Sequence, residues 1–409
     1  LPDPGTPPEP KLPARQRATL SNGLTVLLAE RSTVPKVEFG LIVDAGYAAD
    51  QGGLAGVTSL AMSMLDEGTR TRSSLQISEQ LAQLGAQLNT SSDLDVSTVS
   101  LSALKSQLDA SLELFADVIL NPLFPEDELE RLRAQRLAQI QREKVQPVSL
   151  ALRVFPALLY GEGHAYSNPL TGSGTEESVR EISRSDLQAF HRRWFRPNNA
   201  TLVVVGDISL SELRPKLERL FSNWQGGEVP TKNLATVPPK ASSAVYILDR
   251  PGSLQSVILA GNLAPPKANP DEVSIEAMNA VLGGNFTSRV NMNLREDKHW
   301  SYGAFTLLWN ARGQRPFIVY APVQTDKTKE SVQEALKELR GILGERPVEP
   351  GELQTAKASL TLTLPGRWET MNAVANSLEE QVTFGLPEDY WDTYADRVER
   401  VACRKWRPR

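Results

Sequence analysis

The stretch NPLFPEDEL at residues 121–129 has a counterpart, ERPVEPGEL, at residues 345–353. Each stretch places two prolines three residues apart before a predicted helix, and proline is tolerated in the first turn of a helix but not in its interior. In both halves a strand, a turn and a helix precede the prolines. The counterparts lie roughly 200 residues apart, which exceeds the period of solenoid repeats. The pattern predicts a duplicated domain of the α+β class.

The elements around the first proline pair follow a definite order. ATLSNGLTVLLAE (residues 18–30) predicts a hairpin that turns at Asn22-Gly23. KVEFGLIVDAG (36–46) predicts a buried strand, and GVTSLAMSMLDEGT (56–69) predicts an apolar helix that ends on a Gly-Thr turn. SRSDLQAFHRRWFRPNNATLVVVGDIS (183–209) predicts a helix, a turn and a β-branched strand.

The second half repeats this order. SVILAGNLAP (256–265) predicts a strand, DEVSIEAMNAVLGGNFTS (271–288) predicts a helix that ends in Gly-Gly, and FIVYAPVQ (317–324) predicts another strand. We therefore expect two similar domains, each a mainly antiparallel sheet covered by helices.

Composition shifts suggest where the domains begin and end. We predict a flexible leader at 1–17, an N-terminal domain at 18–223, a Gly-, Pro- and Ser-rich linker at 224–243, and a C-terminal domain at 244–409. The proline-rich leader fits both a mature N-terminus left after signal cleavage and a disordered tail. The final WRPR matches the earlier WFRP, but no strand like TLVVVGD follows it, so the second domain either is incomplete in this sequence or ends differently from the first.

The composition excludes several classes of protein. A formal net charge of -5 and a pI of about 5.6 argue against a nucleic-acid or anionic-membrane binder. No apolar run approaches the roughly 20 residues of a membrane span. Cys403 is the only cysteine, so no intrachain disulfide can form. No G-x-S-x-G, P-loop or G-x-G-x-x-G motif supports an unrelated catalytic site in a homodimer.

Segments from both halves resemble the pitrilysin-like metallopeptidases, whose zinc helix carries the inverted motif H-x-x-E-H. The resemblance extends from about residue 18 to residue 390 and implies that the chain forms half of a clamshell around a closed chamber. The similar segments are SNGLTVLL, GLAGVTSLAMSMLDEGT, HAYSNPLTGSGTEESV, SDLQAFHRRWFRPNNATLVVVGD and NFTSRVNMNLREDKHWSYGA.

The resemblance also implies that this chain has lost the metal site. Anchoring on the final Gly-Thr places the two family histidines on Ser59 and Ser63 and the glutamate base on Met62. The further glutamate ligand falls at or near Gln139. The spacing of i, i+3 and i+4 would put the helix residues on one face. Because Ser, Met and Gln cannot replace His and carboxylate ligands for Zn²⁺, we expect no metal in this chain.

The chain has three histidines, His164, His191 and His299, and they lie far apart without the spacing of metal ligands. We expect His164 and His191 to be structural, either at the surface or hydrogen-bonded within the fold. His299 falls in a segment that keeps a second feature of the family.

That feature is an arginine and a tyrosine seven residues apart, which in LREDKHWSYGA are Arg295 and Tyr302. The resemblance implies that they reach into a zinc site and bind the substrate backbone near the scissile carbonyl. A guanidinium and a phenol can both stabilise an oxyanion there. Outside this context, the same residues would be more typical of a surface salt bridge and of a tyrosine packed on a strand. His299 and Trp300 lie between them and could line the same cleft.

We therefore predict the non-metal-binding subunit of a heterodimeric zinc peptidase that degrades short, unstructured peptides. A homologous partner bearing H-x-x-E-H would hold the zinc. This chain would be inactive alone and part of a zinc metalloendopeptidase when paired. The alternative is a catalytically inactive scaffold or peptide-binding subunit of a larger complex, as with family members in respiratory complexes. We predict a periplasmic location, with the cytoplasm as the alternative.

Overall fold

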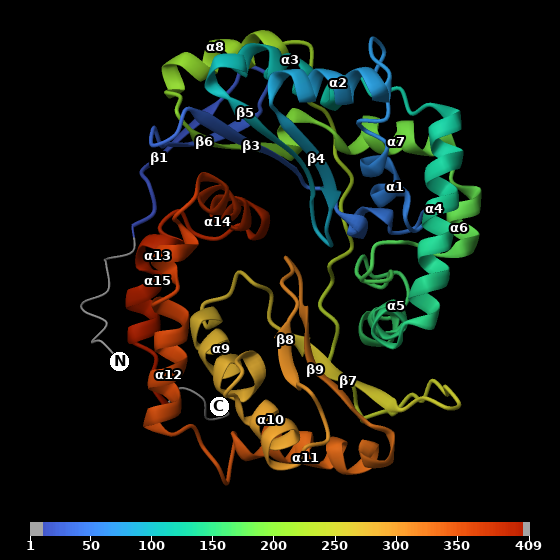
Figure 1. Cartoon of the computed structure of the whole chain (residues 1–409), viewed down its shortest axis with the longest axis vertical. Coiled ribbons are helices and arrows are strands. Elements are labelled where there is room, and N and C mark those ends of the chain that lie inside the picture. The colour runs from blue at the N-terminus through green and yellow to red at the C-terminus, as the bar shows by residue number, and fades with distance from the viewer. Residues whose placement is uncertain (1–10, 404–409) are drawn as a thin grey trace. The chain divides into compact units, whose positions relative to one another are not determined.

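The computed structural model describes residues 11–403, which form two compact units (Figure 1). The six-stranded unit consists of residues 11–234 and 367–386. The three-stranded unit consists of residues 235–366 and 387–403. The chain thus leaves the six-stranded unit and returns to it for one further segment.

The six-stranded sheet has the strand order β1-β2-β6-β3-β5-β4. Strands β2 and β6 run parallel, and the other neighbouring strands run antiparallel. The predicted hairpin is confirmed, and Gly23 in its turn has a φ of 93°, which favours glycine. The strands are β1 (Arg15–Thr19), β2 (Thr25–Glu30), β3 (Lys36–Val43), β4 (Gln87–Ser92), β5 (Ser97–Leu104) and β6 (Ala200–Gly206).

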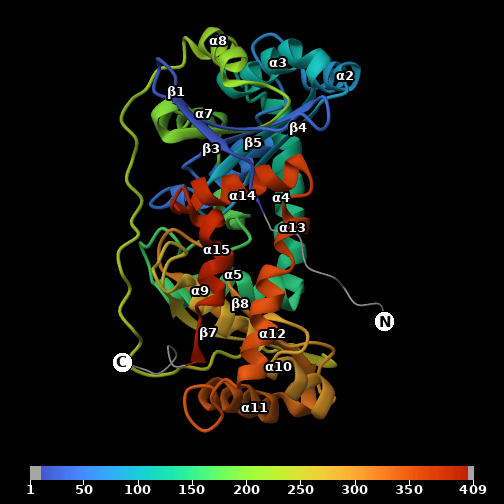
Figure 2. The ribbon, with the colours of Figure 1, turned by 90° about the vertical axis from the view of Figure 1, so that its left-hand side faces the viewer.

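Helices cover both faces of this sheet (Figures 1 and 2). Helices α2, α3 and α8 lie on one face and α14 lies on the other, while α1 packs against β4, α4 and α7. The helices are α1 (Val57–Ser63), α2 (Ser74–Leu84), α3 (Leu108–Leu120), α4 (Glu126–Val145), α5 (Pro147–Tyr160), α6 (Glu176–Glu181), α7 (Arg184–Trp194), α8 (Leu210–Phe221) and α14 (Met371–Phe384), with short 3₁₀ turns η1 (Tyr47–Asp50), η2 (Lys105–Gln107) and η3 (Pro197–Asn199).

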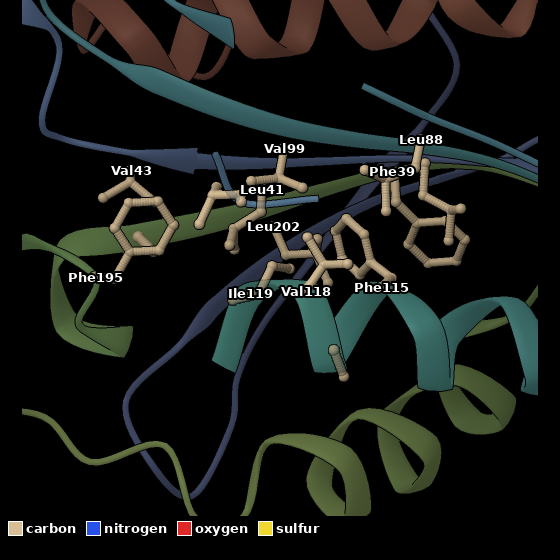
Figure 3. Close-up of a cluster of buried hydrophobic side chains, with 14 of the residues drawn as sticks. Phe39, Leu41, Val43, Leu88, Val99, Phe115, Val118, Ile119, Phe195 and Leu202 are labelled. Carbon is tan, nitrogen blue, oxygen red and sulfur yellow. The ribbon is translucent and has the colours of Figure 1, made fainter. Parts of the chain in front are cut away.

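An apolar core lies between the sheet and α3 (Figure 3). Every second side chain of a strand points to the same face, whereas α3 presents residues three and four apart. Burying a side chain such as Leu or Phe stabilises the fold by about 1.5–3 kcal/mol. The buried residues labelled in the figure are Phe39, Leu41, Val43, Leu88, Val99, Phe115, Val118, Ile119, Phe195 and Leu202.

The segment that contains α14 is held on the sheet by two local features. The guanidinium of Arg31 donates hydrogen bonds to the carbonyl oxygens of Trp368 and Glu369, at 2.7 Å and 2.6 Å. Gly40 of β3 allows a close approach of the helix, because a Cβ at that position would lie 1.9 Å from Oε1 of Glu379.

The three-stranded sheet has the antiparallel order β7-β9-β8, and α11 packs against β7 and β9. Helices α9, α12 and α15 pack on one another. The strands are β7 (Gln255–Ala264), β8 (Phe305–Leu308) and β9 (Arg315–Gln324). The helices are α9 (Glu272–Asn279), α10 (Arg289–Asn291), α11 (Thr328–Gly341), α12 (Pro350–Thr361), α13 (Leu364–Arg367) and α15 (Tyr390–Glu399), with π-helical turns η4 (Ala280–Gly284) and η5 (Met292–Asp297) and the 3₁₀ turn η6 (Thr325–Lys327).

The predicted duplication is confirmed by the order of these elements. Strand β9, turn η6 and helix α11 precede the proline pair and α12, just as β5, η2 and α3 precede the first pair and α4. Pro125 caps α4, and Pro350 begins α12, so both proline pairs lead into helices as predicted. Each unit is a mainly antiparallel sheet covered by helices, which confirms the predicted α+β class.

Strand β7 is an edge strand, and the residues before it are unusually apolar for exposed chain. Residues 244–248 form neither helix nor strand. Val245, Tyr246 and Ile247 are 87%, 65% and 85% exposed, and Leu254 is 89% exposed. Exposed apolar runs beside a sheet edge favour association between chains.

The helix predicted for residues 56–69 is wrong in its length, because α1 ends at Ser63. The hydroxyl of Ser63 donates to the carbonyl oxygen of Ser59, and such bonding within a helix weakens it. Gly68 has a φ of 150°, which a continuing helix does not allow.

The helix predicted for residues 271–288 likewise changes character after Asn279, where it widens into η4. Gly283 lies against β8 at that point, since a Cβ there would be 2.4 Å from the hydroxyl oxygen of Thr306. Among residues 11–403, none of the helices combines the length and apolar character that a membrane crossing requires.

Candidate functional site

Helix α1 is the helix to which the resemblance assigns the metal motif, and Asp50 holds its N-terminus. The Asp50 carboxylate accepts hydrogen bonds from the backbone N–H groups of Gly56 (2.7 Å) and Thr58 (3.0 Å) and from the Thr58 hydroxyl. Complete burial raises the pKa of Asp50 to about 7, although these donors favour the ionised form. Asp50 thus replaces the side-chain cap that Gly56 cannot provide.

The three motif positions on α1 are used for packing. The hydroxyl oxygens of Ser59 and Ser92 lie 3.1 Å apart, and the Ser63 hydroxyl donates to the Ser59 carbonyl oxygen at 2.9 Å. Met62 is 1% exposed and belongs to the apolar core. Zinc sites in proteins are built from imidazole, thiolate and carboxylate groups, none of which these residues provide.

Gln139 on α4, the predicted position of the further ligand, belongs to a hydrogen-bonded network around Glu143. The Gln139 amide donates to Oε1 of Glu143 at 2.8 Å. The other carboxylate oxygen of Glu143 accepts hydrogen bonds at 2.6 Å from both Arg153 and the Ser173 hydroxyl. Burial alone would raise the pKa of Glu143, but the bonds from Ser173, Arg153 and Gln139 lower it below its usual value.

The loop at residues 172–174 connects this network to α1. A Cβ on Gly172 would lie 3.1 Å from the hydroxyl oxygen of Ser59, and Arg153 donates to the carbonyl oxygen of Gly174 at 2.6 Å. Across residues 11–403, no three His, Cys, Asp or Glu side chains cluster in a way that could hold a metal ion. The donor set at the predicted positions therefore does not fit zinc.

Two of the three histidines take part in packing. Nδ1 of His164 accepts a hydrogen bond from the backbone N–H of Tyr166 at 3.0 Å. Nε2 of His191 lies 2.8 Å from the carbonyl oxygen of Ile119, and its ring stacks on Phe195 with centroids 4.7 Å apart. Burial lowers the pKa of His191 to about 4.

Arg295 lies on η5 in the three-stranded unit. Its guanidinium carbon is 4.5 Å from the centroid of the Phe286 ring, and its Nε is 3.3 Å from Oε1 of Glu296. The Arg295 side chain is 36% exposed. An ion pair this exposed contributes at most about 1 kcal/mol, so it does not prevent Arg295 from binding an incoming group.

Tyr302 is 87% exposed, although the backbone on both sides of it is anchored. Ser301 pairs with Val323 of β9, and the backbone N–H of Ala304 donates to Oδ1 of Asn291 at 3.1 Å. The exposure of the phenol differs from that of a tyrosine packed on a strand. An exposed aromatic group on a fixed backbone is typical of a binding residue.

The loop between these two residues folds back on η5. The backbone N–H groups of His299 and Trp300 donate to the carbonyl oxygens of Arg295 (3.2 Å) and Leu294 (3.0 Å). His299 has a φ of 57°, which is uncommon for a residue other than glycine. These hydrogen bonds bring the segments of Arg295 and Tyr302 together, with His299 exposed and Trp300 half-buried on the same loop.

Sequence reasoning did not single out Phe286 and Asn291, which adjoin these residues. Phe286 is 55% exposed beneath Arg295, and Asn291 is fully buried. An asparagine within the apolar helical segment VNMNL is the available signal, because a buried amide needs hydrogen-bonding partners. Nothing in the sequence marks Phe286 as exposed.

Two family models match the chain, and curated relatives agree with them. The model described as "Insulinase (Peptidase family M16)" matches residues 25–170, and that described as "Peptidase M16 inactive domain" matches residues 181–360. The uncharacterized zinc protease ML0855 of Mycobacterium leprae (strain TN) is 25% identical, over 84% of this chain and 77% of the relative. The uncharacterized zinc protease YmxG of Bacillus subtilis (strain 168) is 23% identical, over 80% and 78%.

A third relative is named as a subunit of a complex and not as a protease. Cytochrome b-c1 complex subunit 1, mitochondrial, of Bos taurus is 26% identical over 66% of this chain and 56% of the relative.

Solved structures share the fold. The peptidase M16 inactive domain from Pseudomonas fluorescens superposes with a TM-score of 0.89 at 24% identity, covering 96% of this chain and 93% of that one. A protease from Helicobacter pylori gives a TM-score of 0.88 at 19% identity, covering 97% and 95%. With both family models matched, the chain belongs to the peptidase M16 family, and it is of the type whose sequence lacks the H-x-x-E-H motif.

Proposed function

We propose that this chain is the non-metal subunit of a heterodimeric zinc peptidase that cleaves short, unstructured peptides. The observation that carries the proposal is the contrast between the two halves. The metal-motif positions of the first half are used for packing and hydrogen bonding. In the second half, Arg295 on η5 stays accessible to solvent, and Tyr302 is exposed on an anchored loop. The partner would be a homologous chain bearing H-x-x-E-H.

Arg295 and Tyr302 have the chemistry needed to bind a peptide beside a metal site in another chain. A zinc ion held by the partner would supply activation of water and polarisation of the scissile carbonyl. Arg295 stays charged at every physiological pH and presents several N–H donors, and the hydroxyl of Tyr302 can donate one hydrogen bond. Together they would bind the substrate backbone and stabilise the negative charge that develops on the carbonyl oxygen.

The network around Glu143 supports inactivity of the isolated chain. Its carboxylate already accepts bonds from three side chains, those of Gln139, Arg153 and Ser173. Met62 occupies the position of the family's general base and cannot accept a proton from water. Retention of α1 follows from its packing, because its apolar face belongs to the core of the six-stranded unit.

A second function is favoured by one relative, whose name describes a subunit of the cytochrome b-c1 complex. By that analogy, this chain would be a scaffold or peptide-binding subunit of a larger complex with no part in cleavage. The exposure of Arg295 and Tyr302 favours the peptidase, since a scaffold has no evident need for an anchored arginine and tyrosine.

Capture of the tagged chain from its native extract tests the proposal. The eluate is analysed for zinc and for cleavage of a quenched, unstructured peptide. We expect a co-eluting chain of similar size, about one zinc ion per pair, and cleavage that a chelator abolishes. The Arg295→Ala chain should capture the same partner but cleave poorly. A chain that elutes alone or with unrelated large proteins, without zinc or cleavage, would favour the scaffold instead.

A further inference from the structure

We propose that Asn291 is a positioning residue that fixes Arg295 and Tyr302 relative to each other. The inference rests on the proposed function, because it assumes that these two residues bind substrate. Asn291 ends α10 and is completely buried, and Arg295 follows four residues later on η5.

Both ends of the Asn291 amide are hydrogen-bonded to segments of the candidate site. Its Nδ2 donates to the carbonyl oxygen of Phe286 at 2.6 Å, and its Oδ1 accepts from the backbone N–H of Ala304 at 3.1 Å. An asparagine carries a donor and an acceptor on one short side chain, which neither aspartate at neutral pH nor leucine does. Asn291 therefore joins the turn that carries Phe286 to the segment that follows Tyr302.

The hydrogen bond from Asn291 to the carbonyl oxygen of Phe286 restricts the side chain of Arg295 through the Phe286 ring. With its carbonyl oxygen held, Phe286 presents its ring 4.5 Å from the guanidinium carbon of Arg295. A guanidinium is attracted to the face of an aromatic ring, and stacking limits the orientations of its long side chain. Because Phe286 is itself 55% exposed, the position of its ring depends on its backbone more than on surrounding core packing.

The hydrogen bond between Asn291 and Ala304 anchors the backbone two residues after Tyr302. On the N-terminal side, the Ser301 hydroxyl donates to the carbonyl oxygen of Pro322 in β9 at 2.6 Å. On the C-terminal side, the link between Asn291 and the N–H of Ala304 is the corresponding anchor. Tyr302 is 87% exposed, so the direction of its Cα–Cβ bond is set by these two anchors on the neighbouring residues.

Asn293 provides a matched control two residues further along. It is also buried, at 7% exposed, and its Nδ2 donates at 2.8 Å to the carboxylates of Glu334 and Glu338 on α11. Those bonds tie η5 to α11 and involve neither Phe286 nor Ala304. Loss of Asn293 therefore reports the structural cost of removing a buried amide without a direct effect on Arg295 and Tyr302.

The experiment compares Asn291→Ala with Asn293→Ala in the partner complex, with thermal midpoints and partner affinity measured alongside kinetics. We expect comparable losses of stability, but only Asn291→Ala should lower kcat/KM, by about tenfold. In an Arg295→Ala/Tyr302→Phe background, Asn291→Ala should change kcat/KM less than about twofold, because a residue that acts through others is not additive with them. If Asn291→Ala instead caused a general folding defect, its effect on kcat/KM would multiply the loss already caused by the double variant.

Hydrogen exchange of the isolated chain supplies a readout that does not depend on activity. Asn291→Ala should speed exchange of the Ala304 amide, whereas Asn293→Ala should leave it protected. If Asn291→Ala fails to fold, Asn291→Ser replaces it, since its small, uncharged hydroxyl fits the buried position but is too short to bond to both Phe286 and Ala304. The Ser variant should still speed exchange of the Ala304 amide and lower kcat/KM, by about threefold.

The outcomes separate this inference from the function on which it rests. If Arg295→Ala/Tyr302→Phe leaves the complex fully active, the proposed function and the positioning role both fail. If that double variant loses activity but Asn291→Ala matches Asn293→Ala in kcat/KM, the proposed function stands and the positioning role is overturned. An Asn291→Ala loss that persists unchanged in the double-variant background would also overturn it.

Discussion

The Nε2 atom of Gln139 lies 2.8 Å from Oε1 of Glu143, one turn later on α4. The resemblance places a family metal ligand at or near Gln139, yet in this chain the residue serves as a donor to a buried carboxylate. That carboxylate also accepts bonds from Arg153 and Ser173, which come from α5 and the loop beside α1. The hydrogen-bonded network thus links α4 to α5 and to the loop at residues 172–174.

Restoring a carboxylate by Gln139→Glu should destabilise the protein rather than rebuild a ligand. The substitution removes a donated bond and places two carboxylates four residues apart on one helix, which costs about 1–3 kcal/mol. Urea unfolding at pH 7.5 measures the change. Gln141→Glu, at an exposed position on the same helix, is the control and should shift the free energy of unfolding by less than about 0.5 kcal/mol. Equal stability of the two variants would show that the network is not formed.

Met62→Glu should be more damaging, because Met62 is 1% exposed in the apolar core. Burying an unpaired carboxylate there should lower the free energy of unfolding by more than about 3 kcal/mol. Met62→Leu keeps the apolar character and most of the volume, so it should cost less than about 1.5 kcal/mol. The two variants are compared by chemical denaturation. A Met62→Glu protein as stable as Met62→Leu would mean that the position is open to solvent.

The duplicated α+β architecture could be predicted from sequence because its signals are local. The proline pairs at 122 and 125 and at 347 and 350 mark helix starts, and the Asn22-Gly23 turn marks a hairpin. The length of α1 could not be predicted, since it depends on the Ser63 hydroxyl and on the conformation of Gly68. The packing of residues 367–386 on a sheet built from residues 15–206 is a long-range contact with no local signature.

In the candidate site, too, local sequence patterns could be recognised, whereas contacts that arise only in three dimensions could not. Arg295 and Tyr302 could be singled out because their spacing and flanking residues resemble a family pattern; their roles remain predictions. Phe286 and Asn291 could not, because their relation to Arg295 and Tyr302 arises from a turn and a buried amide in three dimensions. Asp50 was missed for a related reason, since it caps α1 from six residues before Gly56.

His191 should make the stability of the protein depend on pH. Its pKa is lowered to about 4 in the fold, against about 6.5 in the unfolded chain. Between these values the unfolded state binds more protons, so the free energy of unfolding falls as the pH drops from about 6.5 toward 4. His191→Gln removes this contribution. Urea midpoints at several pH values should therefore fall less steeply on acidification in the variant than in the wild type.

The comparison with His191→Gln is needed because the titration of Asp50 changes the free energy of unfolding with pH in the opposite direction. Burial raises its pKa to about 7, so the folded state binds the extra proton between about pH 4 and pH 7. That contribution weakens the fold as the pH rises and is present in both proteins. An identical pH slope in wild type and His191→Gln would contradict the burial of a neutral His191.

Charge on the exposed segment before β7 should reduce self-association of the isolated chain. Tyr246 and Ile247 are 65% and 85% exposed, and lysines near a sheet edge oppose pairing between chains. Tyr246→Lys/Ile247→Lys should shift the sedimentation of concentrated protein toward the monomer. Ser242→Lys/Ser243→Lys adds the same charge at exposed polar positions and should have a smaller effect. Equal effects would assign the change to net charge alone.

Steady-state peptide cleavage by the complex of this chain with its zinc-binding partner shows whether Arg295 and Tyr302 complete the zinc site. Arg295→Ala and Tyr302→Phe are compared with Arg340→Ala and Tyr320→Phe, which lie on α11 and β9 outside the candidate site. We predict that Arg295→Ala lowers kcat/KM by about 10²–10³-fold and Tyr302→Phe by about tenfold, with zinc content and partner affinity unchanged. A complex that keeps full activity with Arg295→Ala would rule out a role of this chain in cleavage through Arg295.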